Sequence, residues 1–297
     1  MAEKALTAGA IQLPKTVAAA ITTKVKDSST IAALSPQLPQ LFADNVALVF
    51  DGASEAEVVA EGAAKSSYTQ EVTAQTAKRV KIQTTTRVTS ELQWADEDNR
   101  TEIIDRIQED QAAAIGRALD YVVYHAVNPK TGAVLPDFTK LSDTATQVTA
   151  GTDETANMDS LISAVNEDYE VNGLALSKTW ANSLRKLRVP STGMRLYPEI
   201  PLNLQTTTVE GLTAATSGTV SGRRATEATK VLAFIGDFNM IRWGMIRDIT
   251  AELIPYGDPD QSGVDLKAHN QIAYRTEAVL AYSVLDPHAF AVLKKAA

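Results

Sequence analysis

The longest amphipathic pattern in the chain covers about residues 101–127. Charged residues, Asp120 among them, lie mostly off an apolar stripe whose members recur at steps of three and four: Ile104, Ile107, Ile115, Ala118, Val122 and Ala126. Asp96, Asp98 or Asn99 can cap the start of this helix, and Asn128-Pro129 ends it. At ~1.5 Å per residue the helix is a rod of roughly 40 Å. We expect a structural spine that extends beyond the core of a small domain.

A polar stretch precedes this helix, and we interpret residues 53–92 as two antiparallel arms of opposite charge. The first arm is acidic, and the returning run alternates as a strand does and is basic. A lone two-stranded ribbon is marginal in water and needs a surface to lie against. We therefore predict a docking loop with intersubunit contact residues, while a solvated surface hairpin fits the same pattern. The predicted contact residues are Glu57, Glu61, Lys65, Lys78, Arg79 and Lys81.

The remaining pattern mixes helices and strands without a βαβ repeat, which indicates an α+β fold. A short buried strand is expected at 45–50, and strong strand patterns occupy 231–235 and 240–253 on either side of the turn Gly236-Asp237. One long strand or a strand pair is expected at 272–285. Helices are expected near 21–34, 158–170 and 178–187, the last capped by Ser177, and a terminal helix after Asp286-Pro287.

Composition and motifs predict no enzyme, no cofactor and no metal site. The chain has no cysteine, and none of its 3 histidines has a second histidine three or four residues away. The segment 258–263 opens like a calcium loop, but His269 occupies the position that requires a bidentate glutamate, so we predict a turn. A phosphate-cradling glycine loop is absent from the sequence.

Charge and hydropathy limit the partners. The net charge is −8, which argues against a dedicated nucleic-acid binder. Two small basic clusters, Arg185-Lys186-Arg188 and Arg223-Arg224, are not interleaved with aromatic residues, and we interpret them as solvated faces or subunit contacts. No run approaches the ~18 apolar residues of a membrane span, and the first residues lack the pattern of a signal peptide. We expect a soluble protein that is not secreted.

Several segments, taken in order, resemble the major capsid proteins of tailed bacteriophages, the family whose fold is named after the Hong Kong 97 phage. VVAEGAAKSSYTQEV is similar to the family's W-V-x-E-G-x-x-K segment before the extended E-loop, with Val58 where tryptophan is common. KRVKIQTTTRVTSELQWAD resembles the returning strand, and the spine helix follows at once. SKTWANSLRKLRVPSTGMRLYPE, FIGDFNMIRWGMIRDITAEL and TEAVLAYSVLDPHAFAVL are similar to a helix and loop, a hairpin, and the closing strand and helix.

The resemblance implies a domain plan and a function. The plan has an N-terminal arm at 1–40, an extended E-loop at 53–86, a peripheral domain with the spine helix at 41–52, 87–140 and 242–280, and an axial domain at 141–241 and 281–297. Copies of the chain would form pentamers and hexamers of an icosahedral shell around double-stranded phage DNA, without sequence-specific DNA binding and without a membrane. The chain would assemble in the host cytoplasm into a virion, with portal, scaffold and decoration proteins as further partners.

Two alternatives remain open at this point. An encapsulin-like compartment shell has the same fold and encloses a cargo enzyme. An unrelated acidic binding protein with a long β-arm would form only small oligomers. The family's cross-linking through a loop lysine is not carried over to Lys65, because no matching asparagine is identifiable.

Overall fold

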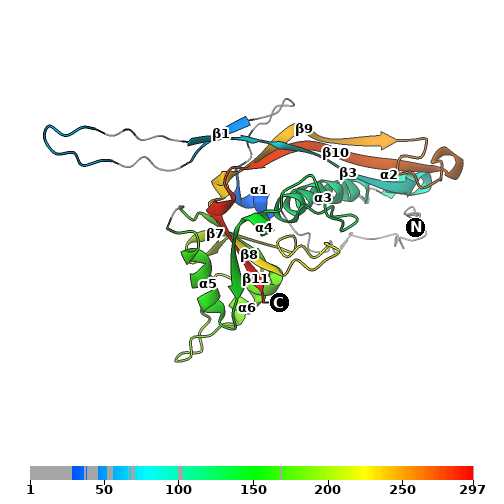
Figure 1. Cartoon of the computed structure of the whole chain (residues 1–297). Helices are drawn as coiled ribbons and strands as arrows, with labels where there is room; N and C mark the ends of the chain where they lie inside the picture. Colours follow the sequence, from blue (N-terminus) through cyan, green and yellow to red (C-terminus); the bar gives the residue numbers. More distant parts are fainter. Residues whose placement is uncertain are drawn as a thin grey trace.

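The computed structural model describes residues 29–36, 38, 46–51, 56–65, 67, 71–99, 103–167 and 169–296. Within them the chain forms a three-stranded sheet, a six-stranded sheet and a two-stranded ribbon, together with helices. Figure 1 shows the long sheet and α3 across the top, the ribbon projecting from one end, and the six-stranded sheet below. The mixed α+β class expected from the sequence is confirmed.

The three-stranded sheet is antiparallel, in the order β3 (Lys78–Thr89), β10 (Gln271–Val284) and β9 (Ile241–Ile254). The register of β3 on β10 runs without a break from Thr89 opposite Gln271 to Lys78 opposite Tyr282. Of the two alternatives expected near 272–285, one long strand or a strand pair, the structure shows the single long strand. Trp243 and Leu280 of this sheet are buried in the same core as Val122 of the long helix.

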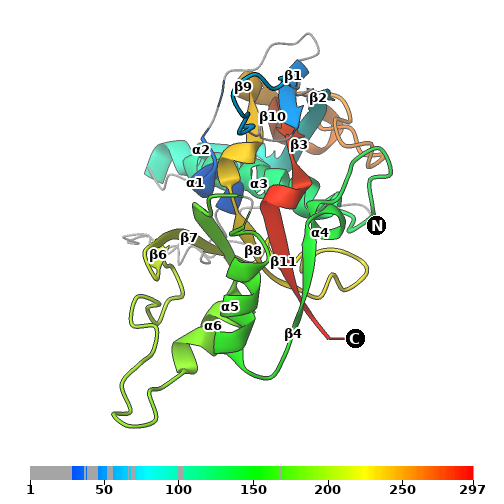
Figure 2. The same cartoon turned by 60° about the vertical axis from the view of Figure 1, so that its left-hand side comes forward.

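The six-stranded sheet has the order β4 (Thr146–Ala150), β11 (Phe290–Lys295), β8 (Val231–Gly236), β5 (Gly173–Ser177), β7 (Leu212–Ser217) and β6 (Thr208–Val209). Helices α5 (Glu154–Ser163) and α6 (Lys178–Lys186) pack on it through a core that contains Trp180 and Leu184 (Figure 2). The Ser177 side chain accepts a hydrogen bond from the Trp180 N–H at 3.2 Å, which confirms the predicted cap. Short helical turns are α4 (Leu141–Thr144), η2 (Phe238–Met240), η3 (Lys267–His269) and η4 (Pro287–Ala289).

Two predictions for the second half of the chain are wrong. After η4 the chain continues as strand β11 instead of the expected terminal helix. Residues 290–293 are all buried, since β11 lies between β4 and β8, and a continuous apolar run is typical of such a central strand. The strands on either side of Gly236-Asp237 do not form a hairpin, because η2 directs β8 and β9 into different sheets.

The long helix α3 (Ile103–His125) lies within the predicted span. It follows α2 (Ser90–Asn99), a helix that was not expected from the sequence. The Asp96 carboxylate accepts hydrogen bonds from the N–H groups of Ile103 and Ile104 at 2.8 and 3.3 Å, which confirms Asp96 as the cap. Of the helix expected near 21–34, the structure describes α1 (Thr30–Leu34), and residues 21–28 lie outside the described part.

The expectation that Asp120 lies on the solvent side of the long helix is wrong, because its exposed fraction is 0%. Its carboxylate accepts hydrogen bonds from the Ser29 hydroxyl at 2.6 Å, the Thr30 N–H at 2.8 Å and the Thr219 hydroxyl at 2.5 Å. Burial raises the pKa of Asp120, and these donors oppose that rise. Asp120 thus joins α1, α3 and the loop after β7 at the centre of the molecule.

Candidate subunit interface and basic pocket

The ribbon consists of β1 (Val46–Asp51) and β2 (Glu71–Thr76), paired antiparallel with Leu48 opposite Ala74. The strand expected at 45–50 is confirmed, but its predicted burial is wrong: Val46 and Leu48 are 57% and 64% exposed. These two side chains share one ribbon face, because alternate residues of a strand point the same way. On the paired strand β2, Val72 lies on the same ribbon face and is 49% exposed. The ribbon therefore presents an apolar surface that its own chain leaves uncovered.

The loop between the two ribbon strands carries the acidic contact residues predicted from the sequence. Its described residues 56–65 form no helix or strand, and Gly62 turns with φ +80°. Glu57, Glu61 and Lys65 are exposed, and Val58 is 99% exposed. Figure 1 shows this loop at the far end of the ribbon, away from both sheets.

Three of the four basic residues of the predicted contact set, Lys78, Arg79 and Lys81, lie elsewhere, on β3. The expected pairing of the acidic arm with the returning basic strand is wrong, since β3 pairs with β10 and the ribbon ends at Thr76. Lys81 Nζ lies 2.8 Å from Glu277 Oε1 of β10, within the same chain. Lys78 and Arg79 are exposed at the start of β3. The structure thus places Glu57, Glu61 and Lys65 in one loop and separates them from the basic residues of β3.

Arg87, also on β3, forms a clamp that the sequence analysis did not identify. Its guanidinium contacts both carboxylate oxygens of Asp260, Asp258 Oδ1 at 2.5 Å and the Val264 carbonyl at 2.9 Å. The Arg87 hydrogen bond lowers the pKa of Asp260. The predicted turn at 258–263 is confirmed, since the Asp258 carboxylate accepts the N–H groups of Ser262 and Gly263. The two carboxylates that resembled calcium ligands therefore hold an arginine.

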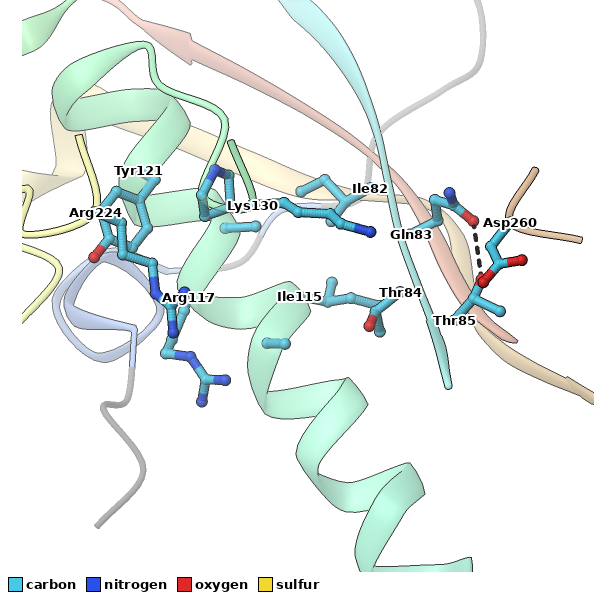
Figure 3. A pocket seen from close by; sticks show the side chains of 13 residues that line it. Ile82, Gln83, Thr84, Thr85, Ile115, Arg117, Tyr121, Lys130, Arg224 and Asp260 are labelled. Carbon is cyan, nitrogen blue, oxygen red and sulfur yellow. Dashed lines mark hydrogen bonds between the residues drawn. The ribbon is translucent and has the colours of Figure 1, made fainter. Parts of the chain in front are cut away.

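A pocket opens between the middle of β3 and the second half of α3, with a volume of about 370 Å³ (Figure 3). Arg117 from α3, Lys130 from the following loop and Arg224 from the loop after β7 line it. Tyr121 lies in the same wall. Burial raises the pKa of Tyr121, while the charges of Arg223 and Arg224 and hydrogen bonds from the Arg223 side chain and the Arg224 backbone oppose that rise.

The histidines do not assemble into a site. His125 is buried, and its Nε2 lies 3.1 and 3.0 Å from the carbonyl oxygens of Thr219 and Val220. Burial lowers the pKa of His125 to about 4. His269 and His288 are exposed. The described ranges contain no group of three or more histidine, aspartate or glutamate side chains arranged to hold a metal ion. They also contain no helix long and apolar enough to cross a membrane.

Comparisons with known proteins agree with the architecture. The model of the phage capsid family matches residues 9–295. A solved chain from Mycobacterium phage Ogopogo is 32% identical with a TM-score of 0.82, and the match covers 99% of this chain and 100% of that one. A chain from Gordonia phage Cozz is 29% identical with a TM-score of 0.79, covering 97% and 93%. Among curated proteins, none matches this chain.

A more distant similarity extends to another kind of particle. A chain described as the capsid of an empty GTA particle, computed with C5 symmetry, is 15% identical with a TM-score of 0.66 and covers 97% of both chains. At this identity the similarity concerns the fold alone.

Proposed function

Because the chain belongs to the phage capsid family, we propose that it is the major shell subunit of a tailed phage and encloses double-stranded DNA. The chain is a structural component of the virion capsid and not an enzyme. In this proposal copies assemble as pentamers and hexamers, because closed shells are built by repeating one set of contacts. Portal, scaffold and decoration proteins would join a shell that assembles in the host cytoplasm.

The observation that carries this proposal is the projecting ribbon with its exposed loop. Val46, Leu48 and Val72 expose apolar side chains on a two-stranded element, which is marginally stable by itself in water. Exposed apolar surface of this kind marks sites of protein association. We propose that the ribbon and loop of one copy lie across a neighbouring copy, with Glu57, Glu61 and Lys65 at that contact.

The domain plan follows from the same proposal. The three-stranded sheet with α3 corresponds to the peripheral domain, and the six-stranded sheet with α5 and α6 corresponds to the axial domain. The pairing of β1 with β2 supports an E-loop that ends near Thr76, whereas residue 86 was expected from the sequence. Of the N-terminal arm expected at 1–40, residues 1–28, 37, 39 and 40 lie outside the described residues, and the described part includes α1.

Electron microscopy with light scattering on the protein, co-produced with its neighbouring genes, tests the proposed function. We expect closed particles; persistent monomers or small rings would contradict it and favour the binding-protein alternative. The gene neighbours separate the two kinds of shell. A portal or terminase gene supports the virus, and a peroxidase or ferritin-like gene supports the encapsulin-like compartment.

Reversing the loop charge tests the docking surface. We expect Glu57→Lys with Glu61→Lys to prevent particle formation while the circular dichroism spectrum and thermal midpoint of the unassembled chain stay unchanged, because both side chains are exposed. A matched control is Glu167→Lys with Glu170→Lys, which makes the same charge change at exposed positions after α5. Normal particles from the loop variant would contradict the docking proposal.

A further inference from the structure

The chain between α6 and β6 forms a small hairpin at residues 187–196, which we call the arginine hairpin. Arg188 and Arg195 are partners in an antiparallel bridge, and the Val189 N–H donates to the Met194 carbonyl at 2.9 Å. Figure 2 shows this part of the chain extending away from α5 and α6 before it returns to β6. The hairpin is therefore a defined projection from the six-stranded sheet and its helices.

The arginine hairpin holds two like charges side by side. Cations placed directly opposite each other on paired strands repel and weaken the pairing. The Arg188 guanidinium donates to the carbonyl oxygens of Arg185 and Leu187 at 3.0 Å each, and neither Arg188 nor Arg195 forms an ion pair with a described residue. Met194 lies on the other face of the hairpin, because neighbouring residues of a strand alternate, and it is 69% exposed. The hairpin is suited to a partner that provides both carboxylates and apolar side chains.

A groove of complementary character lies between α5 and the turn that joins β6 to β7. It has a volume of about 250 Å³. Most of its lining side chains are apolar: Met158, Ile162, Val171, Leu174, Val209 and Leu212. Asn166 and Glu210 complete the lining, and Glu210 is exposed at the turn itself. The volume lies below the roughly 300–1,000 Å³ of small-molecule sites, so a side chain of another protein fits this groove better than a cofactor does.

Negative charge accompanies this groove. Burial raises the pKa of Tyr197 to about 12, and the charges of Glu210 and Asp159 add to that rise. Both carboxylates therefore lie near a tyrosine that shares one core with Met158 and Leu174 of the groove. Glu210 and Asp159 are exposed, and neither forms an ion pair with a described residue. Within one chain the arginine hairpin thus leaves these two carboxylates unpaired.

We propose that the arginine hairpin of one copy docks in this groove of a second copy. Charge complementarity selects this occupant, because the two arginines bring unpaired positive charge while Glu210 and Asp159 bring unpaired negative charge. A guanidinium matches the planar geometry of a carboxylate and forms two parallel hydrogen bonds with it. The exposed Met194 of the docked hairpin covers apolar side chains of the groove.

The two surfaces differ, so a contact between them is heterologous. A repeated heterologous contact closes into a ring when its rotation allows closure. The inference rests on the proposed function, in which copies form pentamers and hexamers, and it names a contact that joins neighbours within such a ring. The ribbon and its acidic loop are a separate surface.

Exchanging the charges of the two surfaces tests the docking. The full-length protein is co-produced with its neighbouring genes, and closed particles are counted by electron microscopy. We expect Arg188→Glu with Arg195→Glu to lower their yield at least about tenfold, because like charges then face each other. Glu210→Arg with Asp159→Arg should do the same for the same reason. The four substitutions together should restore assembly, since opposite charges face each other again.

Matched controls reverse two charges at exposed positions outside both surfaces. They are Lys230→Glu with Lys267→Glu, and Asp137→Arg with Glu227→Arg. We expect normal particles from both controls, and unchanged circular dichroism from every unassembled variant.

Normal particles from both surface variants, or a fourfold variant that does not assemble, would overturn the inference and leave the shell function standing. Normal particles of the hairpin variant that lack another virion protein would assign the hairpin to that protein and also overturn it. An absence of closed particles from the unmodified chain would contradict the proposed function and this inference together.

A disulfide between copies gives a second measurement. The chain has no cysteine, so Met194→Cys with Leu212→Cys introduces its only two thiols. After oxidation of assembled particles, we expect a ladder of linked chains on a non-reducing gel, and only single chains from either single variant. Unlinked chains in particles of the double variant would overturn the inference.

Discussion

Strands β1 and β8 have almost the same composition and opposite environments. The sequence of β1 is VALVFD and that of β8 is VLAFIG. Every residue of β8 is buried, because it pairs with β11 on one side and β5 on the other and lies in the core beneath α5 and α6. β1 pairs only with β2, so Val46 and Leu48 remain exposed. One apolar strand pattern can therefore belong to the core of the chain or to a surface that remains available to another molecule.

The largest expected effect is a core truncation in β8. Phe234 is fully buried, and its ring stacks on Tyr124 with centroids 4.4 Å apart. We expect Phe234→Ala to lower the free energy of unfolding by about 3–5 kcal/mol. Leu48→Ala in β1 should change it by at most about 0.5 kcal/mol, because that side chain is already in water. Urea denaturation of the unassembled chain measures both, and similar losses would contradict the comparison.

The next effect concerns pH and the core that β8 shares with His125. Burial lowers the folded-state pKa of His125 to about 4, so the neutral form is favoured in the folded chain. The part of the free energy of unfolding that depends on neutral His125 is fully present above the unfolded-state pKa of about 6.5. It is lost as the pH falls from there towards 4. The loss corresponds to about 3 kcal/mol at pH 4. This loss is measured by comparing the free energy of unfolding of the unmodified chain and of His125→Asn between about pH 6.5 and pH 4. Parallel pH profiles of the two proteins would contradict the assignment to His125.

The smallest effect is expected on the exposed edge of the long sheet. Lys81 and Glu277 form an ion pair whose side chains are 63% and 32% exposed. Solvent screens such a pair, so Lys81→Ala should lower the free energy of unfolding by no more than about 0.5 kcal/mol. Lys78→Ala, at an exposed position of the same strand, is the control for charge alone. A loss above about 1.5 kcal/mol would show that the pair contributes as a buried one does.

The sequence predicts best those features that depend on neighbours along the chain. The span of α3, its Asp96 cap and the Ser177 cap of α6 follow from local spacing and side-chain chemistry. The exposure of the acidic segment with Glu57 and Glu61 was expected as well, although the predicted pairing of this segment with the basic strand was wrong. These features need no knowledge of the tertiary structure.

Features that depend on distant partners were missed. Asp120 is buried because Ser29 and Thr219 donate to it from 91 and 99 residues away. Arg87 is buried against Asp258 and Asp260 of the loop between β9 and β10, 171 and 173 residues later in the chain. Asp286-Pro287 is typical of the start of a helix. The residues that follow form strand β11 instead, because β4 and β8 pair with it on both sides. The pocket has the same origin, since Arg117 and Arg224 meet only in the fold.

A reconstruction of the assembled particle by cryo-electron microscopy tests whether the ribbon of one copy docks on a neighbouring copy. It shows where the ribbon and residues 56–65 of each copy lie. If the ribbon docks on a neighbour, Val46, Leu48 and Val72 are covered by that neighbouring copy, and Glu57 and Glu61 face its cationic side chains. A ribbon that folds back onto its own chain, or that projects into solvent in the closed particle, would contradict it.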